Sequence, residues 1–129
     1  MLGTWNLKWR ILPGIMTRPE FITAYSSLPA SDKISFLAQT SHQLTVYLRG
    51  AYPDVSSESK LDGLSLKKLQ GANELQHHLS SELRHIHANN PDRYPDNVLL
   101  NILWAKADFY GISEELNYSL LYVMKWFQR

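Results

Sequence analysis

The chain has 129 residues, of which 44% are hydrophobic and 19% charged, and its formal net charge is +1 at pH 7. This length and composition predict one globular domain and argue against wholesale disorder. The near-zero net charge gives no general attraction to nucleic acid or acidic membranes, so nucleic acid is disfavoured as a partner. The chain has no cysteine, which excludes disulfides and thiolate metal sites and fits a cytoplasmic location. No segment approaches the roughly 20 apolar residues that span a bilayer, so we expect no membrane association.

The N-terminal region alternates apolar and polar side chains over residues 5–11, which is the pattern of a strand. Its apolar edge consists of Trp5, Leu7, Trp9 and Ile11. A Pro-Gly pair then breaks the chain, and a strong helix start follows Met16. We expect residues 1–15 to be a short extended segment or an extension upstream of an alternative start, and residues 16–129 to form the helical domain.

Five helices are predicted in that domain. The first begins at the capping box Thr17-Arg-Pro-Glu20 and ends near Pro29. The others are expected over about 31–51, 65–88, 96–110 and 113–129, with the main loop at 53–63. The caps predicted for the second, fourth and fifth helices are Ser31-Asp32, Asp96 and Ser113. The predicted fold class is therefore an all-α, small bundle-like domain of about five helices with a short extended N-terminal segment.

The sequence also predicts the roles of two glycines and the burial of the fourth helix. Gly71 weakens the third helix by roughly 1 kcal/mol relative to alanine, which indicates a close helix crossing at that point. Gly111 is expected at the left-handed position that ends the fourth helix. That helix is apolar on nearly all sides, so we expect it to be central and buried.

The pattern His-x-Leu-x-x-x-Leu-Arg occurs twice, from His42 to Arg49 and from His77 to Arg84. Positions seven apart return to nearly the same side of a helix, so histidine and arginine share the edge of a buried stripe in each copy. If the second and third helices pack antiparallel, His42 would lie near the level of Arg84 and His77 near that of Arg49. Such a groove would suit a phosphate, a carboxylate or an acidic residue of a partner. Packing alone is the simpler explanation, because both residue types are ordinary at core edges.

Candidate metal ligands lie on the third predicted helix. Glu74, His78 and His85 share the exposed side of the third helix at spacings that could hold a divalent metal. No second helix supplies an obvious carboxylate pair, however, and a solvated polar face explains these side chains. The sequence contains no nucleophile elbow, phosphate-binding loop, dinucleotide fingerprint or calcium loop. We therefore expect no catalytic residue, no metal and no cofactor.

Aromatic side chains mark the fifth helix as an interaction surface. One face carries Leu116, Leu120, Val123 and Phe127. Tyr118, Tyr122 and Trp126 recur every four residues and form a separate stripe. Tyrosine and tryptophan are frequent in protein interfaces because they join an apolar body to a polar tip. We expect this stripe to meet the Trp5 and Trp9 edge, within one chain or between two chains of a dimer.

These observations predict a non-enzymatic helical protein that binds another protein or a second copy of itself, as an adaptor, a regulator or an antitoxin- or immunity-like inhibitor. The alternative is a phosphoryl-transfer or hydrolytic enzyme that uses the paired His/Arg groove. An enzyme would need those four side chains to converge in an open pocket. A binding protein would need an exposed, contiguous apolar patch.

Overall fold

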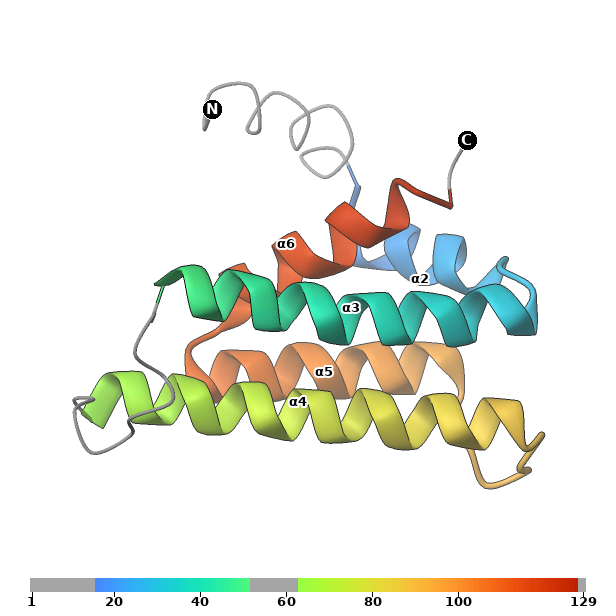
Figure 1. Ribbon diagram of the computed structural model, residues 1–129. Coiled ribbons are helices and arrows are strands. Elements are labelled where there is room, and N and C mark those ends of the chain that lie inside the picture. Colours follow the sequence, from blue (N-terminus) through green and yellow to red (C-terminus); the bar gives the residue numbers. More distant parts are fainter. Residues whose placement is uncertain (1–15, 52–62, 128–129) are drawn as a thin grey trace.

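The computed structural model describes residues 16–51 and 63–127, which form five helices (Figure 1). In chain order these are α2 (Arg18–Ser26), α3 (Ala30–Ala51), α4 (Gly63–His87), α5 (Asp96–Tyr110) and α6 (Ser113–Met124). The described ranges contain no strand, and the predicted all-α, bundle-like class is confirmed. The strand-like pattern at 5–11 and all but the last residue of the predicted main loop lie outside those ranges. Within them, no helix combines the length and the apolar character needed to cross a membrane.

The first helix begins at the predicted capping box. The backbone N–H of Glu20 donates to the Thr17 hydroxyl (3.2 Å), and the backbone N–H of Thr17 donates to the Glu20 carboxylate (2.8 Å). These two hydrogen bonds satisfy N–H groups that lack partners at a helix start. The bond from the Thr17 backbone N–H, together with the Thr17 hydroxyl, holds the pKa of the Glu20 carboxyl below its ordinary value. Further along α2, the buried Phe21 packs its ring 6.1 Å from that of Trp104 on α5. The local sequence therefore sets where α2 begins and what it packs against.

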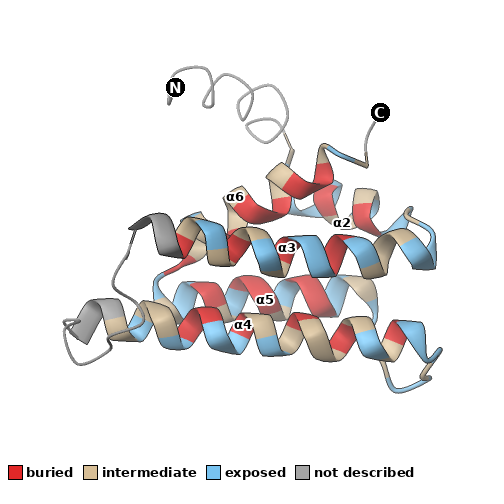
Figure 2. Ribbon diagram, in the orientation of Figure 1, coloured by how far each residue is buried: buried red, intermediate tan, exposed pale blue. Residues whose placement is uncertain are grey.

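The two longest helices, α3 and α4, lie side by side and run antiparallel (Figure 1). Gln76 of α4 donates hydrogen bonds to the carbonyl oxygen of Ser41 (3.2 Å) and to the hydroxyl of Thr45. These bonds place the middle of α4 opposite the middle of α3. Buried residues concentrate on the helix faces that point toward one another (Figure 2). From this pair the core receives Leu37, Leu44, Leu48, Ala72, Leu75 and Leu79.

Both predicted roles of glycine are confirmed. A Cβ atom added at Gly71 would lie 2.3 Å from the Cβ of Tyr110, so α4 and α5 cross in close contact there. Gly111 has φ of 74° and ends α5 in the left-handed conformation, with its N–H bonded to the carbonyl of Ala107. A residue with a side chain would be strained in that conformation.

The side-chain caps predicted for three helices differ from the observed ones. Helix α3 begins at Ala30, so its predicted cap lies inside the first turn. Asp96 makes no capping bond to α5, because its carboxylate is paired with the ammonium group of Lys33 of α3 at 2.9 Å. Ser113 makes no capping bond to α6, and its hydroxyl donates to the carboxylate of Asp108 instead. Asp96 and Ser113 therefore bind other side chains and do not bind the free backbone N–H groups at the start of their own helices.

Helix α5 is not buried on all sides, which corrects the expectation of a central helix. Its inward face is buried and consists of Leu99, Leu100, Leu103, Trp104 and Ala107. The opposite face is open to solvent along most of its length. A small bundle has too few helices to enclose one of its members, so the apolar residues on the outer side of α5 stay uncovered within the described structure.

Candidate functional site

An apolar stripe runs along the outer side of α5, and we call it the α5 face. It consists of Val98, Ile102, Ala105 and Phe109. Val98 is 37% exposed and Phe109 is 67% exposed, Ala105 is also exposed, and Ile102 is half-buried. The successive spacings of four, three and four residues are those of the apolar positions of a heptad repeat. All four side chains therefore lie on one side of the helix, turned away from the core.

Charged and polar groups border the α5 face. On its α4 side, Lys106 is paired with Glu74 at 3.5 Å. Close to Phe109, the ammonium nitrogen of Lys67 lies 5.2 Å from the ring centroid, and the Tyr110 ring meets the Phe109 ring edge-on at 4.9 Å. An exposed apolar centre with a charged rim is the usual anatomy of a protein-binding surface.

The aromatic stripe predicted on α6 lies beside α3. Tyr118 and Tyr122 are half-buried, and Trp126 is 52% exposed. The Tyr118 ring lies 6.2 Å from that of Tyr47 on α3, and the Tyr122 ring lies 6.3 Å from that of Trp126. Burial raises the pKa of Tyr47 to about 12. Helix α3 therefore supplies the aromatic partner seen in the described residues, while Trp5 and Trp9 lie outside them.

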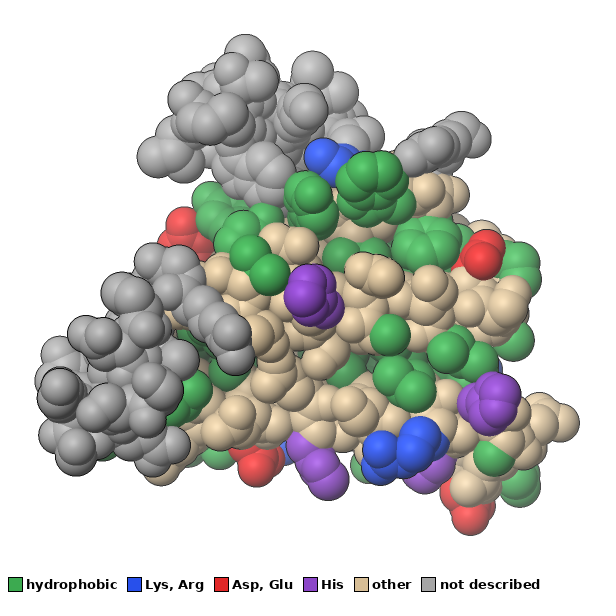
Figure 3. Space-filling model, in the orientation of Figure 1, with side chains coloured by type: hydrophobic (Ala, Val, Ile, Leu, Met, Phe, Trp, Pro, Cys, Tyr) green, Lys and Arg blue, Asp and Glu red, His purple; other side chains and the backbone are tan. Residues whose placement is uncertain are grey.

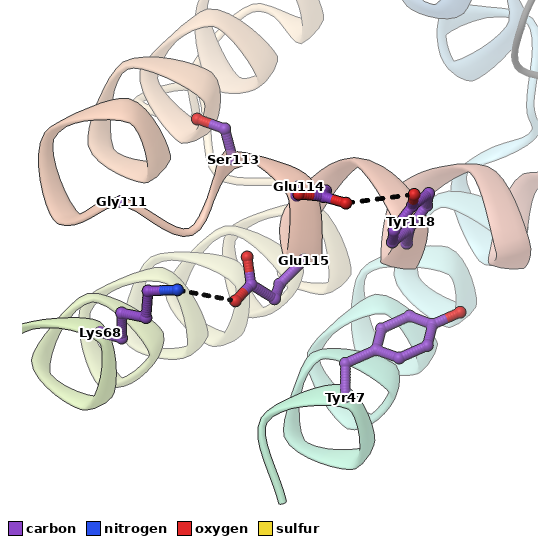
Figure 4. Close-up of a pocket in the computed structure, with 7 residues that line it drawn as sticks. All are labelled: Tyr47, Lys68, Gly111, Ser113, Glu114, Glu115 and Tyr118. Carbon is purple, nitrogen blue, oxygen red and sulfur yellow. Dashed lines mark hydrogen bonds and ion pairs between the residues drawn. The ribbon is translucent and has the colours of Figure 1, made fainter. Parts of the chain in front are cut away.

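A pocket of about 560 Å³ lies where α3, α4 and the start of α6 meet (Figure 4). Lys68 reaches across it to Glu115 at 3.7 Å. The hydroxyl of Tyr118 donates to the carboxylate of Glu114 at 3.3 Å, and burial raises the pKa of Tyr118 above its ordinary value. Both carboxylates that line this pocket, those of Glu114 and Glu115, therefore already have a partner within it.

The paired His/Arg residues are placed on neighbouring helices, and three of their four side chains are described. His42, His77 and Arg84 are exposed, and the side chain of Arg49 lies outside the described residues. The hydrogen bond between Gln76 and the Ser41 carbonyl brings the two histidines to nearly the same level, while Arg84 lies two turns beyond His77. The level predicted for Arg84 therefore differs from the observed one.

No hydrogen bond or ion pair found in the described part of the chain joins these histidines and arginines. Figure 3 shows histidine side chains at separate places on one face of the molecule. The described contacts at this level between α3 and α4 are core residues and the hydrogen bonds of Gln76. The shared groove therefore stays a prediction.

The sequence prediction missed a cluster of charged side chains at the end of the bundle where α4 is joined to α5. We call this cluster the polar clasp, and it consists of Lys33, Glu82, Arg93 and Asp96. The guanidinium nitrogen Nη1 of Arg93 lies 3.7 Å from Glu82 and 3.6 Å from Asp96. The Glu82 side chain is only 2% exposed. The clasp joins α3, α4, α5 and the turn before α5 through charged groups.

Burial raises the pKa of Glu82, against the lowering effects of a hydrogen bond from the Tyr94 backbone and of the nearby Arg93. The sequence did contain a signal for this residue. Leu75, Leu79, Glu82 and Ile86 follow the heptad spacing of a buried stripe, so the carboxylate occupies a core position. A charged residue at such a position is rare unless it is paired, and the partner comes from the following turn.

The three residues considered for a metal have other contacts. Glu74 is paired with Lys106, and His85 lies 4.0 Å from Glu82. The ring of His78 is half-buried, 5.5 Å from the ring of Tyr94, and burial lowers its pKa. Within residues 16–51 and 63–127, no group of three or more His, Asp or Glu side chains is placed to hold a metal ion.

Comparisons of this chain with protein-family models, with curated proteins and with solved structures gave no match. Its function must therefore be inferred from its own surfaces.

Proposed function

We propose that this protein is a non-enzymatic binding protein, and that the α5 face packs against an amphipathic helix of a protein partner. The observation that carries the proposal is the exposed heptad stripe, which ends in a Phe109 side chain two-thirds open to solvent. The absence of cysteine supports a cytoplasmic setting for this binding.

A helix is the partner that the α5 face fits best. Apolar residues at heptad spacing on one helix form the holes into which the apolar residues of a second helix insert. Covering a phenylalanine side chain fully provides about 1.5–3 kcal/mol, and most of that gain is still available at Phe109. Charged pairs at the rim, such as Lys106 with Glu74, would keep the free protein in solution.

The enzymatic alternative has less support. A phosphoryl-transfer or hydrolytic site would need the two histidines and two arginines to converge on one substrate. His42, His77 and Arg84 instead lie exposed on helix surfaces, with no contact between them among the described side chains. Exposed histidines of this kind are ordinary solvated residues.

The proposal is tested with a designed peptide as the probe. We would measure binding of a fluorescent amphipathic peptide of about three heptads, with leucine at its apolar positions, by fluorescence anisotropy. The wild-type chain should bind it, and Phe109→Asp should weaken binding at least about tenfold because a carboxylate would be buried in an apolar contact. Val46→Asp is the matched control, since Val46 is 46% exposed but lies on α3, and it should bind like wild type.

Circular dichroism would confirm that all three proteins are equally helical. Two results would overturn the proposal: a wild-type chain that does not bind the peptide, or a Phe109→Asp variant that binds it as well as wild type does.

A further inference from the structure

We infer that residues 5–11 bind in a groove between α3 and the end of α6 of their own chain. This segment precedes the part of the chain that the structure describes, and its apolar edge consists of Trp5, Leu7, Trp9 and Ile11. None of the described residues that line the groove belongs to α5. The inference is therefore independent of the function proposed for the α5 face.

The α6 side of the groove is aromatic. The groove has a volume of about 320 Å³, and its wall at the end of α6 contains Tyr122, Trp126 and Phe127. The Trp126 ring meets the Tyr122 ring edge-on at 6.3 Å, and Trp126 is 52% exposed. The Phe127 ring meets the buried Phe36 ring edge-on at 6.1 Å, which attaches this wall to the core. Figure 3 shows hydrophobic side chains gathered over α6.

The α3 side of the groove is polar and uncharged. It consists of Ser35, Gln39 and Gln43, which are four residues apart and follow one side of the helix. Their hydroxyl and amide groups can donate hydrogen bonds to a peptide backbone and accept them from it. The backbone of an extended segment needs such partners when it is covered. Because no described side chain on either wall is charged, the groove suits an apolar, extended piece of chain.

The spacing of the side chains on the two surfaces matches. Alternate residues on one edge of an extended chain lie about 6.6 Å apart. Tyr118, Tyr122 and Trp126 recur every four residues, a step of about 6 Å along a helix. The apolar side chains at positions 5, 7, 9 and 11 can therefore pack one after another against these rings. Two of the four are tryptophans, and aromatic pairs gain from edge-on or offset contacts.

The described chain begins close to this groove. Met16 is half-buried and lines a second pocket together with Leu121 of α6. Leu121 directly precedes Tyr122, and Trp126 lies about 7.5 Å beyond Leu121 along the helix axis. The five steps of chain from Met16 back to Ile11 can span up to about 17 Å. The segment can therefore reach the groove while Met16 stays in its observed place.

The short connection favours binding within one chain over binding to a second copy. Only residues 12–15 separate the segment from Met16, and a tether of this length gives a roughly millimolar effective concentration. The groove of a second copy would be available only at the much lower concentration of the protein itself. Pro13 and Gly14 lie in this connection and allow the chain to turn toward α6.

A spin label on the polar edge of the segment tests this placement in the full-length protein. Lys8→Cys gives the chain a single cysteine, which is coupled to a nitroxide. In NMR spectra of the nitrogen-15-labelled protein, the indole N–H of Trp126 and the side-chain amide of Gln39 should lose most of their intensity until the nitroxide is reduced. The backbone N–H of Glu74 should keep its intensity, because that residue lies on the side of α4 that contacts α5.

Two matched variants of the spin-labelled protein test which edge of the segment makes the contact. Trp9→Glu should abolish the intensity loss at Trp126, because it would place a carboxylate in an apolar contact. Arg10→Glu introduces the same side chain on the opposite edge, and the loss should remain. The backbone N–H signals of α4 and α5 would show that both variants are folded. The inference would be overturned if Trp126 lost no intensity, or if the loss persisted in Trp9→Glu.

A mixed sample separates binding within one chain from exchange between copies. It contains nitrogen-15-labelled protein without nitroxide and nitroxide-labelled protein without nitrogen-15. The Trp126 signal should keep its intensity in this mixture. A loss in the mixture as large as in the doubly labelled protein would show that the segment binds a second copy, and binding within one chain would be wrong.

Discussion

The hydroxyl of Tyr25 is buried at the core side of the polar clasp, and among the described residues no hydrogen-bond partner is found for it. Burial raises the pKa of Tyr25 above its ordinary range, and the nearby Asp96 and Glu82 add to that effect, so the phenol stays neutral. Its ring packs 5.4 Å from that of Phe36. The ring and the hydroxyl of this one residue therefore have opposite effects on the free energy of unfolding.

Replacing Tyr25 by phenylalanine separates those two effects. A buried polar group without a partner costs about 1–3 kcal/mol, so Tyr25→Phe should leave the free energy of unfolding unchanged or raise it by about 1 kcal/mol. Tyr25→Ala should lower it by about 3–5 kcal/mol, because the ring is lost as well. Urea denaturation would measure both variants. If Tyr25→Phe were less stable than wild type by more than about 1 kcal/mol, the hydroxyl would have a stabilising partner.

At the scale of helices, local signals predicted most of the starts, but α6 ends at Met124 and not at residue 129, and contacts between distant helices were not predicted. The capping box at Thr17, the helix crossing at Gly71 and the helix end at Gly111 follow from the conformations of single residues and their neighbours. Asp96 was predicted as a cap, but the Lys33 ammonium that it contacts comes from a helix 63 residues earlier in the chain. The sequence around Asp96 therefore could not predict its pairing with Lys33.

The same limit explains two further errors, one about the outer face of α5 and one about the level of Arg84 relative to α3. An all-apolar helix can be central, or it can have one face in the core and another at an interface, and hydrophobicity alone does not distinguish these cases. Phe109 shows which case applies to α5 only after α4 and α6 have been placed. The level of Arg84 relative to His42 likewise depends on the offset between two helices, which no repeat within either helix determines.

Gly71→Ala tests the close crossing of α4 and α5. The added Cβ would lie 2.3 Å from the Cβ of Tyr110, an atom that cannot move without moving the backbone of α5. Overpacking of this kind costs about 1–3 kcal/mol, which should outweigh the gain of roughly 1 kcal/mol in helix propensity. Asn73→Ala, at an exposed position on the same helix, should be nearly neutral or slightly stabilising. Thermal melts would compare them, and a Gly71→Ala protein as stable as wild type would contradict the crossing.

At the scale of the whole molecule, the polar clasp ties the end of the bundle together. Lys33 belongs to α3, Glu82 to α4 and Asp96 to α5, and Arg93 of the intervening turn contacts both carboxylates. Removing one partner of a buried ion pair leaves the other charge buried without compensation, which lowers stability. Replacing a charge whose burial costs more than its ion pair returns can raise stability. The stability of the entire domain should therefore depend on the ionisation of Glu82.

Glu82→Gln tests that dependence across pH. The fold raises the pKa of Glu82 above its ordinary value of 4.5, so the folded chain holds the proton more readily than the unfolded chain does. The stability contributed by the protonated carboxyl is fully present below that ordinary value, and it is lost as pH rises through the raised pKa. Glutamine has nearly the same shape and no charge to bury, so its advantage over wild type should grow through that range and persist at neutral pH.

Urea denaturation of both proteins from acid to neutral pH would measure this difference. Glu74→Gln is the matched control, because its carboxylate is also paired with a cation but is 52% exposed, and its stability should follow that of wild type at every pH. If the Glu82→Gln protein instead lost stability relative to wild type as pH rises, the prediction would be wrong. The attraction between Glu82 and Arg93 would then outweigh the cost of burying the carboxylate, and the clasp would hold the domain together through that ion pair.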